Sequence, residues 1–471
     1  MSLNPADAAF ETVLRQRLPK TCFRPQSPHY QTEPRGFFQG QAGLVLAPAS
    51  TAEAAEIVQQ CAAAGVGIVP FGGGTGLVGG QVMETGARPV ILSLERMKRI
   101  RDINPVDNIL LAEAGVVLAD IRAAADGVGR LFPLSLASEG SCQIGGNLAT
   151  NAGGVGVLRY GNARDLCLGL EVVLPDGSIW NGLGRLRKDN TGYDLKNLLI
   201  GAEGSLGLIT AASLKLFHRP DHQLTAFLQV ASPEAALSVL ALCQSRLGGM
   251  VSACELIHRQ GFDFLRETMP QIRLPFAKPG EWMLLVEIDA IADGGADTRF
   301  EAILGQAMEQ GLAQDALIAQ NQVQRQAYWT VRETIPEANR RIGAIYSHDI
   351  SVPNSRIPEL IDKGAGLIAA LGDFRINCFG HLGDGNLHYN IYPPRGRNRD
   401  EFSDRRDSIK HAIYDLVYRL GGSMSAEHGI GRLKLDDLVR YGQAEKLAMM
   451  RRIKQALDPK GIMNPGAVVP P

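Results

Sequence analysis

The chain has 471 residues, of which 45% are hydrophobic and 21% charged, with 48 Lys and Arg against 49 Asp and Glu. This composition is typical of a globular protein with two or three structural units, and the near-zero charge excludes a general nucleic-acid binder. No apolar run approaches the roughly 18 residues that span a bilayer, and the seven cysteines are scattered without a CxxC pair. We expect neither a membrane span nor a disulfide framework. We also expect a cytoplasmic protein, because Asp7 and Glu11 stand where a targeting peptide would be basic.

The first part of the chain is expected to alternate helices with short strands. Ser50 and Glu53 form a capping box, which predicts a helix to about residue 64. Pro220 marks the expected boundary of this part. Strands are predicted over 66–71, 90–94, 110–114, 170–174 and 206–217.

Beyond Pro220 the pattern favours an α+β second domain. The last residues are too few for a domain of their own, so we expect them to pack on another part of the chain. Strands are predicted over 224–230 and 283–288, and helices from 232, from 297, over 323–341 and from 356.

Many of the 53 glycines fall into two clusters. In the first, residues 74–79 satisfy GxGxxG, with Glu95 about 20 residues further on, as in dinucleotide-binding sequences. A Rossmann fold needs a crossover helix after this loop, and residues 80–89, interrupted by Gly86 and Pro89, are too short to supply one. We expect instead a loop whose backbone N–H groups wrap a pyrophosphate, although a glycine turn that binds nothing fits this segment equally well.

The second cluster, residues 140–154, is rich in small residues with amide or hydroxyl side chains. Together with the segments 170–177 and 201–210, the two clusters resemble the FAD-binding domain of the vanillyl-alcohol oxidase / p-cresol methylhydroxylase flavoproteins over residues 40–218. We expect non-covalent FAD, because His29 is the only histidine before residue 218 and Cys142 reads as a small buried residue. The cofactor-binding residues that the resemblance implies are Pro70, Gly72, Gly73, Gly74, Thr75, Gly76, Leu77, Gly140, Ser141, Gly145, Asn147, Thr150, Asn151, Gly153, Glu203, Gly207, Ile209 and Asn464.

A third group of residues lies in the second half. The sequence Asp384-Gly385-Asn386 is a turn, so the flanking strands can point His381 and His388 into one space. Two imidazoles with the carboxylate of Glu427 form a set that suits a divalent metal with an open position for substrate. For each histidine alone, a hydrogen-bonded place in the core is the alternative.

The segments 380–388, 425–431 and 463–466 resemble the FAD-linked D-2-hydroxyacid dehydrogenases of the D-2-hydroxyglutarate and D-lactate type. The resemblance implies an α+β fold: a two-part FAD-binding domain of the p-cresol methylhydroxylase type, a cap domain of an antiparallel sheet with helices, and a C-terminal segment that returns to the flavin. We place the FAD-binding domain at 1–220, the cap at 221–420 and the C-terminal segment at 421–471.

The same resemblance implies the roles of the site residues. His381, His388 and Glu427 would bind a divalent metal, zinc first and manganese or iron as alternatives. His428 would be the catalytic base, and Arg332, Asn386 and His428 would contact the substrate. The expected reaction passes the C2 hydride of a D-2-hydroxyacid to FAD while His428 takes the hydroxyl proton. Electrons would pass on to an electron-transfer flavoprotein or a quinone, and a homodimer is left open.

Three other functions stay open from the sequence: a non-haem iron oxygenase, the flavin subunit of a multi-subunit glycolate oxidase, and a redox-neutral enzyme of the alkylglycerone-phosphate synthase type. Ser347 and Pro336 stand where hydroxyglutarate-type relatives usually carry lysine and threonine. The sequence therefore predicts a shift toward D-2-hydroxyacids with a smaller or less charged tail, D-lactate among them. Arg332, Arg340 or Arg341 could compensate for the missing lysine.

Overall fold

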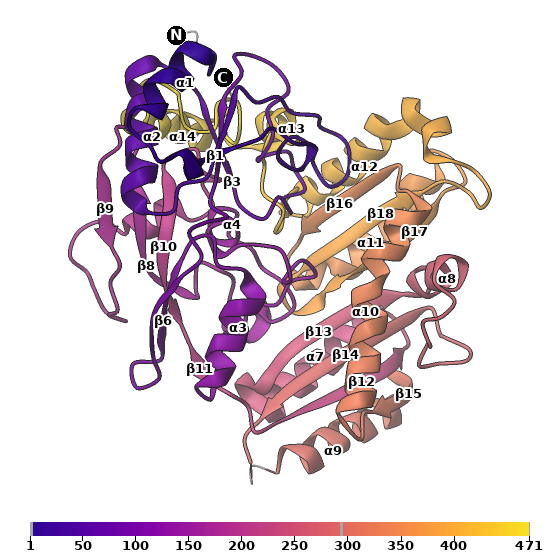
Figure 1. Ribbon diagram of the computed structural model, residues 1–471. Coiled ribbons are helices and arrows are strands. Elements are labelled where there is room, and N and C mark those ends of the chain that lie inside the picture. Colours follow the sequence, from indigo (N-terminus) through magenta and orange to yellow (C-terminus); the bar gives the residue numbers. More distant parts are fainter. Residues whose placement is uncertain (1–2, 293–294, 471) are drawn as a thin grey trace. The chain divides into compact units, whose positions relative to one another are not determined.

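The computed structural model describes residues 3–292 and 295–470, and the chain divides into two compact units (Figure 1). The first unit comprises Met1–Gly154, Gly161–Arg219 and Glu427–Pro471, and the second comprises Val155–Tyr160 and Pro220–Ala426. None of the described helices is long and apolar enough to cross a membrane.

A four-stranded sheet opens the first unit. The strand order is β1-β2-β4-β3, with β2 and β3 parallel to β4 and β1 antiparallel to β2. The predicted helix before β3 is confirmed as α2, Thr51–Ala64, which is capped by the Ser50 side chain and ends at Gly65 in the left-handed conformation. The strands are β1 (Phe23–Arg24), β2 (Leu44–Leu46), β3 (Ile68–Phe71) and β4 (Val90–Ser93).

A five-stranded antiparallel sheet forms the other half of this unit, in the order β5-β6-β10-β8-β9. Its central strands β8 and β10 are buried over most of their length, as their apolar sequences predict. The strands predicted over 110–114, 170–174 and 206–217 are confirmed. The strands are β5 (Ile100–Asn104), β6 (Ile109–Glu113), β8 (Cys167–Val173), β9 (Ile179–Gly182) and β10 (Leu208–Lys215), and the helices are α1 (Ala8–Arg15), α3 (Leu118–Gly127), α4 (Ile144–Ala149) and α6 (Leu195–Leu199). A two-stranded pair, β7 (Arg130–Leu131) with β11 (Phe217–His218), completes the unit.

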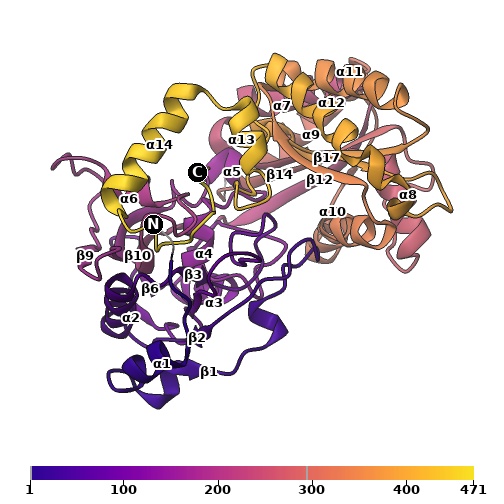
Figure 2. The same ribbon diagram turned by 90° about the horizontal axis from the view of Figure 1, so that it is seen from above.

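The end of the chain is part of the same unit. Its helices α13 (Leu435–Tyr441) and α14 (Ala444–Leu457) are drawn in yellow in Figure 2. After them the backbone pairs with β3, because Ile68 N donates to Ile462 O and Asn464 N donates to Ile68 O, each at 2.8 Å. The last residues thus lie beside the strand that leads into the first glycine cluster.

The second unit contains a seven-stranded sheet in which all neighbouring strands are antiparallel. Its order is β15-β12-β14-β13-β17-β18-β16. The strands are β12 (His222–Val230), β13 (Val251–His258), β14 (Trp282–Ala290), β15 (Ala313–Ile318), β16 (Tyr346–Ser351), β17 (Arg375–His381) and β18 (Asn386–Tyr392).

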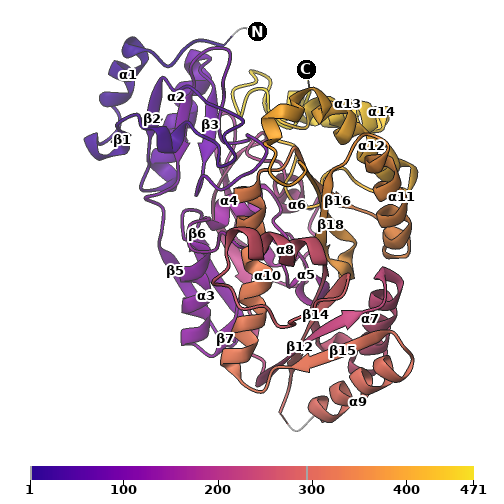
Figure 3. The same cartoon turned by 90° about the vertical axis from the view of Figure 1, so that its right-hand side faces the viewer.

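Helices cover both faces of this sheet (Figure 3). One face packs against α8 and α10 through a core that includes Phe227, Phe262, Trp329 and Ile335. The predicted helix over 323–341 is confirmed as α10, Gln322–Ile342. Helix α8 is Arg259–Thr268, and the helices of the opposite face are α7 (Pro233–Leu247), α9 (Ala296–Glu309), α11 (Ile357–Ala369) and α12 (Arg406–Arg419); the short helix α5 (Val157–Tyr160) also belongs to this unit.

Candidate active site

The first glycine cluster forms a loop without a helix between β3 and β4, in agreement with the prediction that this segment does not belong to a Rossmann fold. Within residues 3–292 and 295–470, the backbone N–H groups of 72–77 donate to no protein acceptor. A Cβ on Gly73 would lie 2.2 Å from the Ser141 carbonyl oxygen, so only glycine fits where this loop crosses the second cluster. The loop therefore presents a run of backbone donors, which suits a pyrophosphate.

The second cluster supplies buried acceptors beside that loop. Gln143 Oε1 and Asn147 Oδ1 are buried side-chain oxygens without a hydrogen-bond partner in the described chain. A Cβ on Gly140 or on Gly146 would meet no atom within 4 Å. Orphaned polar atoms next to open backbone indicate that a polar ligand belongs here, and these residues fit FAD.

Several residues predicted to bind FAD have packing contacts. A Cβ on Gly145 would lie 2.6 Å from the Ala114 Cβ, and one on Gly207 would lie 2.9 Å from Val172 Cγ1. Ile209 is buried within β10. These residues bring the loops and the sheet into close contact, and thereby set the shape of the site.

Backbone strain also marks this region. Only five non-glycine residues among those described have positive φ, and three of them are predicted site residues: Asn151 (52°), Glu203 (49°) and Asn464 (44°). Positive φ is costly for a residue with a side chain and persists where surrounding contacts enforce it. At Glu203 and Asn464 those contacts are hydrogen bonds within the protein.

Glu427 and His428 lie at the start of the C-terminal segment. His428 Nε2 is 3.9 Å from Glu427 Oε1, and the Gly154 N–H donates to Glu427 Oε2 at 3.3 Å. Both side chains are about one-fifth exposed, at 17% and 20%. The first unit therefore presents an imidazole and a carboxylate side by side at the end of the second glycine cluster.

The predicted hairpin around Asp384-Gly385-Asn386 forms in the second unit. Gly385 takes a φ of 77°, and His381 pairs directly with Asn386 across the strands. The rings of His381 and His388 lie with their centroids 6.0 Å apart. Both imidazoles lie on one face of the sheet, because His381 pairs with Asn386 and His388 is two residues after Asn386 on the same strand.

A residue that the sequence analysis missed, Glu255 on β13, joins two that it named. Its Oε1 lies 2.6 Å from His381 Nδ1, and its Oε2 accepts a hydrogen bond from Arg332 Nε at 2.6 Å. Burial acts to raise the pKa of Glu255, but the nearby Arg332 and His381 outweigh it and hold that pKa at about 2. The available signal was a carboxylate inside an apolar strand, which is costly unless paired.

Asp349 on β16 was missed as well. It pairs with His388 across the sheet, and the carboxylate and ring atoms of these two residues lie within 4.8 Å of each other. The Asn386 amide, predicted to contact substrate, donates to Asp349 Oδ1 and to the Ile350 carbonyl, each at 3.0 Å. The second unit therefore carries two carboxylates, of Glu255 and Asp349, and two imidazoles on one sheet face.

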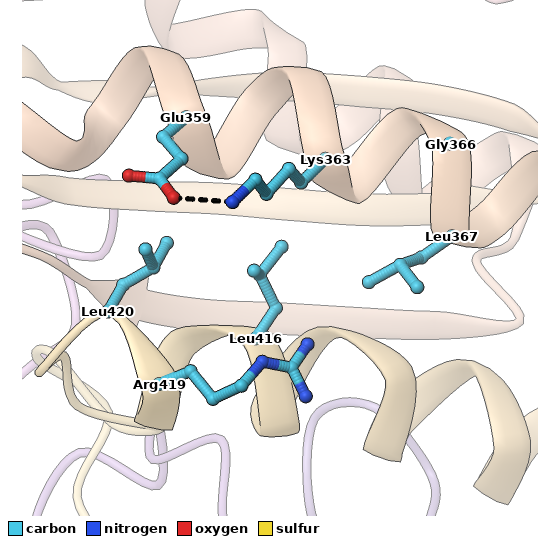
Figure 4. Close-up of a pocket in the computed structure, with 7 residues that line it drawn as sticks. All are labelled: Glu359, Lys363, Gly366, Leu367, Leu416, Arg419 and Leu420. Carbon is cyan, nitrogen blue, oxygen red and sulfur yellow. Dashed lines mark hydrogen bonds and ion pairs between the residues drawn. The ribbon is translucent and has the colours of Figure 1, made fainter.

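A cavity of about 440 Å³ lies between α11 and α12, lined by residues that include Glu359, Lys363 and Arg419 (Figure 4). These helices cover the opposite face of the sheet. Tyr389, next to His388 in the strand, points to that face, where a Cβ on Gly364 of α11 would lie 2.8 Å from its hydroxyl. The cavity is therefore separate from the histidine pair.

Comparison with known proteins identifies the family. Residues 42–182 match the FAD binding domain, and residues 219–468 match the C-terminal domain of FAD linked oxidases. The D-2-hydroxyglutarate dehydrogenase of Arabidopsis thaliana mitochondria is 36% identical over 92% of this chain and 76% of its own length. The chain belongs to the family of FAD-linked D-2-hydroxyacid dehydrogenases.

A further relative agrees with this assignment, and a solved structure agrees with the fold. The D-2-hydroxyglutarate dehydrogenase of Xanthomonas citri pv. viticola is 36% identical over 90% of this chain and 88% of its own length. The structure of p-cresol methylhydroxylase superposes with a TM-score of 0.76 at 17% identity, covering 99% of this chain and 98% of the other. The fold class expected from the sequence is confirmed, and the protein is an FAD-dependent oxidoreductase.

Proposed function

We propose that the protein oxidises a D-2-hydroxyacid to the 2-oxo acid by hydride transfer to non-covalently bound FAD. The observation that carries the proposal is the Glu255 carboxylate, which holds both His381 and Arg332, because it places a metal-competent imidazole beside a carboxylate-binding guanidinium. The names of the relatives, D-2-hydroxyglutarate dehydrogenases, support the reaction class.

The proposed metal ligands are His381, His388 and Glu427. Glu255 at Nδ1 fixes the His381 tautomer that offers Nε2 to a metal, an arrangement that raises the affinity of histidine ligands. The N–H of Ala426 donates to the Asp349 carbonyl at 3.3 Å, and Asp349 is the residue that pairs with His388 across the sheet. Glu427 is the next residue after Ala426. A zinc ion, or manganese or iron, fits this donor set and would lower the pKa of the substrate hydroxyl when bound.

The chain's own residues would perform the remaining steps. His428 would accept the hydroxyl proton at a ring nitrogen. Arg332 would bind the substrate carboxylate through its terminal nitrogens, since its Nε is held by Glu255 and the side chain is nearly buried. A guanidinium fixed in this way loses little entropy on binding.

We propose a preference for tails smaller or less charged than that of D-2-hydroxyglutarate. Ser347 pairs across the sheet with Asn390, so two neutral side chains occupy this part of the sheet face. Arg340 and Arg341 both bind Glu337 on the exposed side of α10, at 2.7 and 2.8 Å, which makes compensation by either one unfavourable. D-2-hydroxyglutarate itself, named for the relatives, is the second candidate.

We propose that an electron-transfer flavoprotein or a quinone accepts the electrons and that the protein acts in the cytoplasm. A homodimer is the assembly to be tested. All seven cysteines are buried and free, which supports a reducing compartment. A glycolate oxidase subunit and an alkylglycerone-phosphate synthase-like enzyme are the alternative functions. Activity of the isolated chain with an artificial acceptor would exclude the first, and net oxidation of substrate would exclude the second.

The substrate proposal is tested by kcat/KM with an artificial acceptor for D-2-hydroxyglutarate, D-malate, D-lactate and D-2-hydroxybutyrate. We expect at least one monocarboxylate to match or exceed the dicarboxylates. A large preference for both dicarboxylates would contradict the shift and leave the dehydrogenase assignment intact. Acid precipitation in parallel should release all the yellow colour, because FAD is held without a covalent bond.

A further inference from the structure

Glu203, predicted from sequence to bind FAD, has its carboxylate turned to the C-terminal segment of its own unit. Oε1 accepts the N–H of Ile430 at 2.8 Å, and the N–H of Gly431 lies 3.2 Å from Oε1 and 3.0 Å from Oε2. A Cβ on Gly429 would lie 2.6 Å from Oε1. The residues that directly follow His428 are therefore packed against this carboxylate.

A second set of contacts ties the same segment to the first glycine cluster. Arg432 donates to the carbonyl oxygens of Gly79 and Gly80 and to Asn464 Oδ1, each at 2.9 Å. The Asn464 amide donates to Gly80 O at 3.0 Å and to the Glu203 carbonyl at 2.8 Å. Gly80, at the end of the pyrophosphate loop, thus lies inside a ring of bonds made by Glu203, Arg432 and Asn464.

This ring is buried and carries two opposite charges. Glu203 is 8% exposed, and burial raises its pKa, while burial lowers the pKa of Arg432 to about 10. Bonds between a buried charged group and backbone donors cost more to break than bonds at the surface. The segment after His428 is therefore held much more firmly than its loop character suggests.

We propose that Glu203 is a positioning residue, which fixes residues 428–431 against Gly80 and so sets the place of His428, without itself binding FAD. The inference rests on the proposed role of His428 as the base. It assigns Glu203 to the link between the cofactor loop and the base rather than to the cofactor.

The bonds from the Glu203 carboxylate to the N–H groups of Ile430 and Gly431 are called the Glu203 clamp below. Hydrogen exchange of the FAD-loaded protein tests this clamp in the absence of substrate. In Glu203→Gln an amide group would face the N–H groups of Ile430 and Gly431 with one acceptor oxygen fewer, so exchange within 427–433 should accelerate about 10-fold or more. The matched control is Glu33→Gln, another buried carboxylate of this unit, which accepts the N–H of Phe37. Unchanged exchange in Glu203→Gln, or equal acceleration in the control, would overturn the proposal.

The second arm measures FAD content, metal content and kinetics of the same variants. Glu203→Gln should keep FAD and KM and lose about 10-fold or more in kcat, with Glu33→Gln like the wild type. Loss of FAD affinity without faster exchange would make Glu203 a cofactor ligand and overturn the proposal. Gly429→Ala, which presses a methyl group on Glu203 Oε1, should give the same faster exchange if Glu203→Gln does not fold.

The two arms also separate this inference from the function it rests on. If the wild type reduces its flavin with none of the hydroxyacids, the proposed function fails and the catalytic role of Glu203 fails with it, whatever the exchange result. If the wild type is active and Glu203→Gln exchanges faster with unchanged kcat, the function stands and the positioning role is overturned.

Discussion

Two buried carboxylates, one in each unit, have opposite surroundings. Glu203 is held by backbone N–H groups, and burial raises its pKa, whereas Glu255 is held by Arg332 and His381, which lower its pKa to about 2. Glu203 therefore orders a stretch of main chain, and Glu255 orders two side chains. In both cases the carboxylate supports neighbours that the proposed reaction would use, and this explains why neither is placed on the surface.

The largest expected effect concerns the segment that Glu203 orders. His428→Ala should slow flavin reduction by about 10²–10⁴-fold while FAD and metal stay bound. The variant removes the general base, whereas the bonds between Glu203 and the main chain remain. Stopped-flow absorbance of the flavin under anaerobic conditions measures this rate. A variant that reduces its flavin at the wild-type rate would remove His428 from the mechanism.

The next effect concerns the side chains that Glu255 orders. Glu255→Gln should weaken metal binding by about 10–100-fold, because His381 loses the partner that fixes its tautomer. The matched control is Glu287→Gln on the adjacent strand, whose carboxylate binds Arg325 and Trp329 of the same helix but no histidine. Titration with Zn²⁺ monitored by calorimetry compares the two, and equal losses would show that any buried carboxylate under α10 has this effect.

A change in substrate choice, of about the same size, is expected at α10 and β16 of the same unit. The double variant Pro336→Thr with Ser347→Lys should raise kcat/KM for D-2-hydroxyglutarate relative to D-lactate by about 10–100-fold, the value of one charge-assisted hydrogen bond. Each single variant should give part of this gain. An unchanged ratio in the double variant would mean that the tail of the substrate is recognised elsewhere.

The smallest expected effect is on stability, and its sign separates the two carboxylates. Glu255 has a pKa below its ordinary value of 4.5, so its stabilisation is present above that pH and is lost as the pH falls toward 2. Glu203 has a raised pKa, so its contribution is fully present below pH 4.5 and is lost as the pH rises from 4.5 through that raised pKa. Urea unfolding between pH 3 and 6 gives the free energy of unfolding of the wild type, of Glu255→Gln and of Glu203→Gln. The difference between wild type and variant, plotted against pH, should have slopes of opposite sign for the two variants. Two slopes of the same sign would contradict the assigned environments.

The sequence predicts well where the signal is local. The motif that begins at Ser50 predicts the start of α2, where the Ser50 hydroxyl accepts the Glu53 N–H. The turn Asp384-Gly385-Asn386 likewise predicts the hairpin that brings His381 near His388. The absence of a helix between β3 and β4 follows from residues 80–89, which come after the glycine motif, are interrupted by Gly86 and Pro89, and are too short for a crossover helix and its return. Each of these features lies within a few residues of the motif that predicts it.

The missed residues depend on pairings that are distant in the chain. Glu255 meets His381 only through the register of β13 with β17, across 126 positions, and Asp349 meets His388 through the register of β16 with β18. The clamp likewise joins Glu203 to Ile430 and Gly431, which lie 227 and 228 positions further along the chain. A single sequence does not reveal these pairings, so none of the three contacts was predicted.

Anaerobic reduction of the bound flavin by D-2-hydroxyacids is the decisive measurement of the proposed reaction. The yellow protein, with one FAD and one divalent metal per chain, should be bleached by the D and not the L enantiomer of a 2-hydroxyacid, with release of the 2-oxo acid. Removal of the metal by a chelator should abolish bleaching while the flavin stays bound. Metal-free protein that is bleached at the same rate, or protein that no D-2-hydroxyacid bleaches, would contradict it.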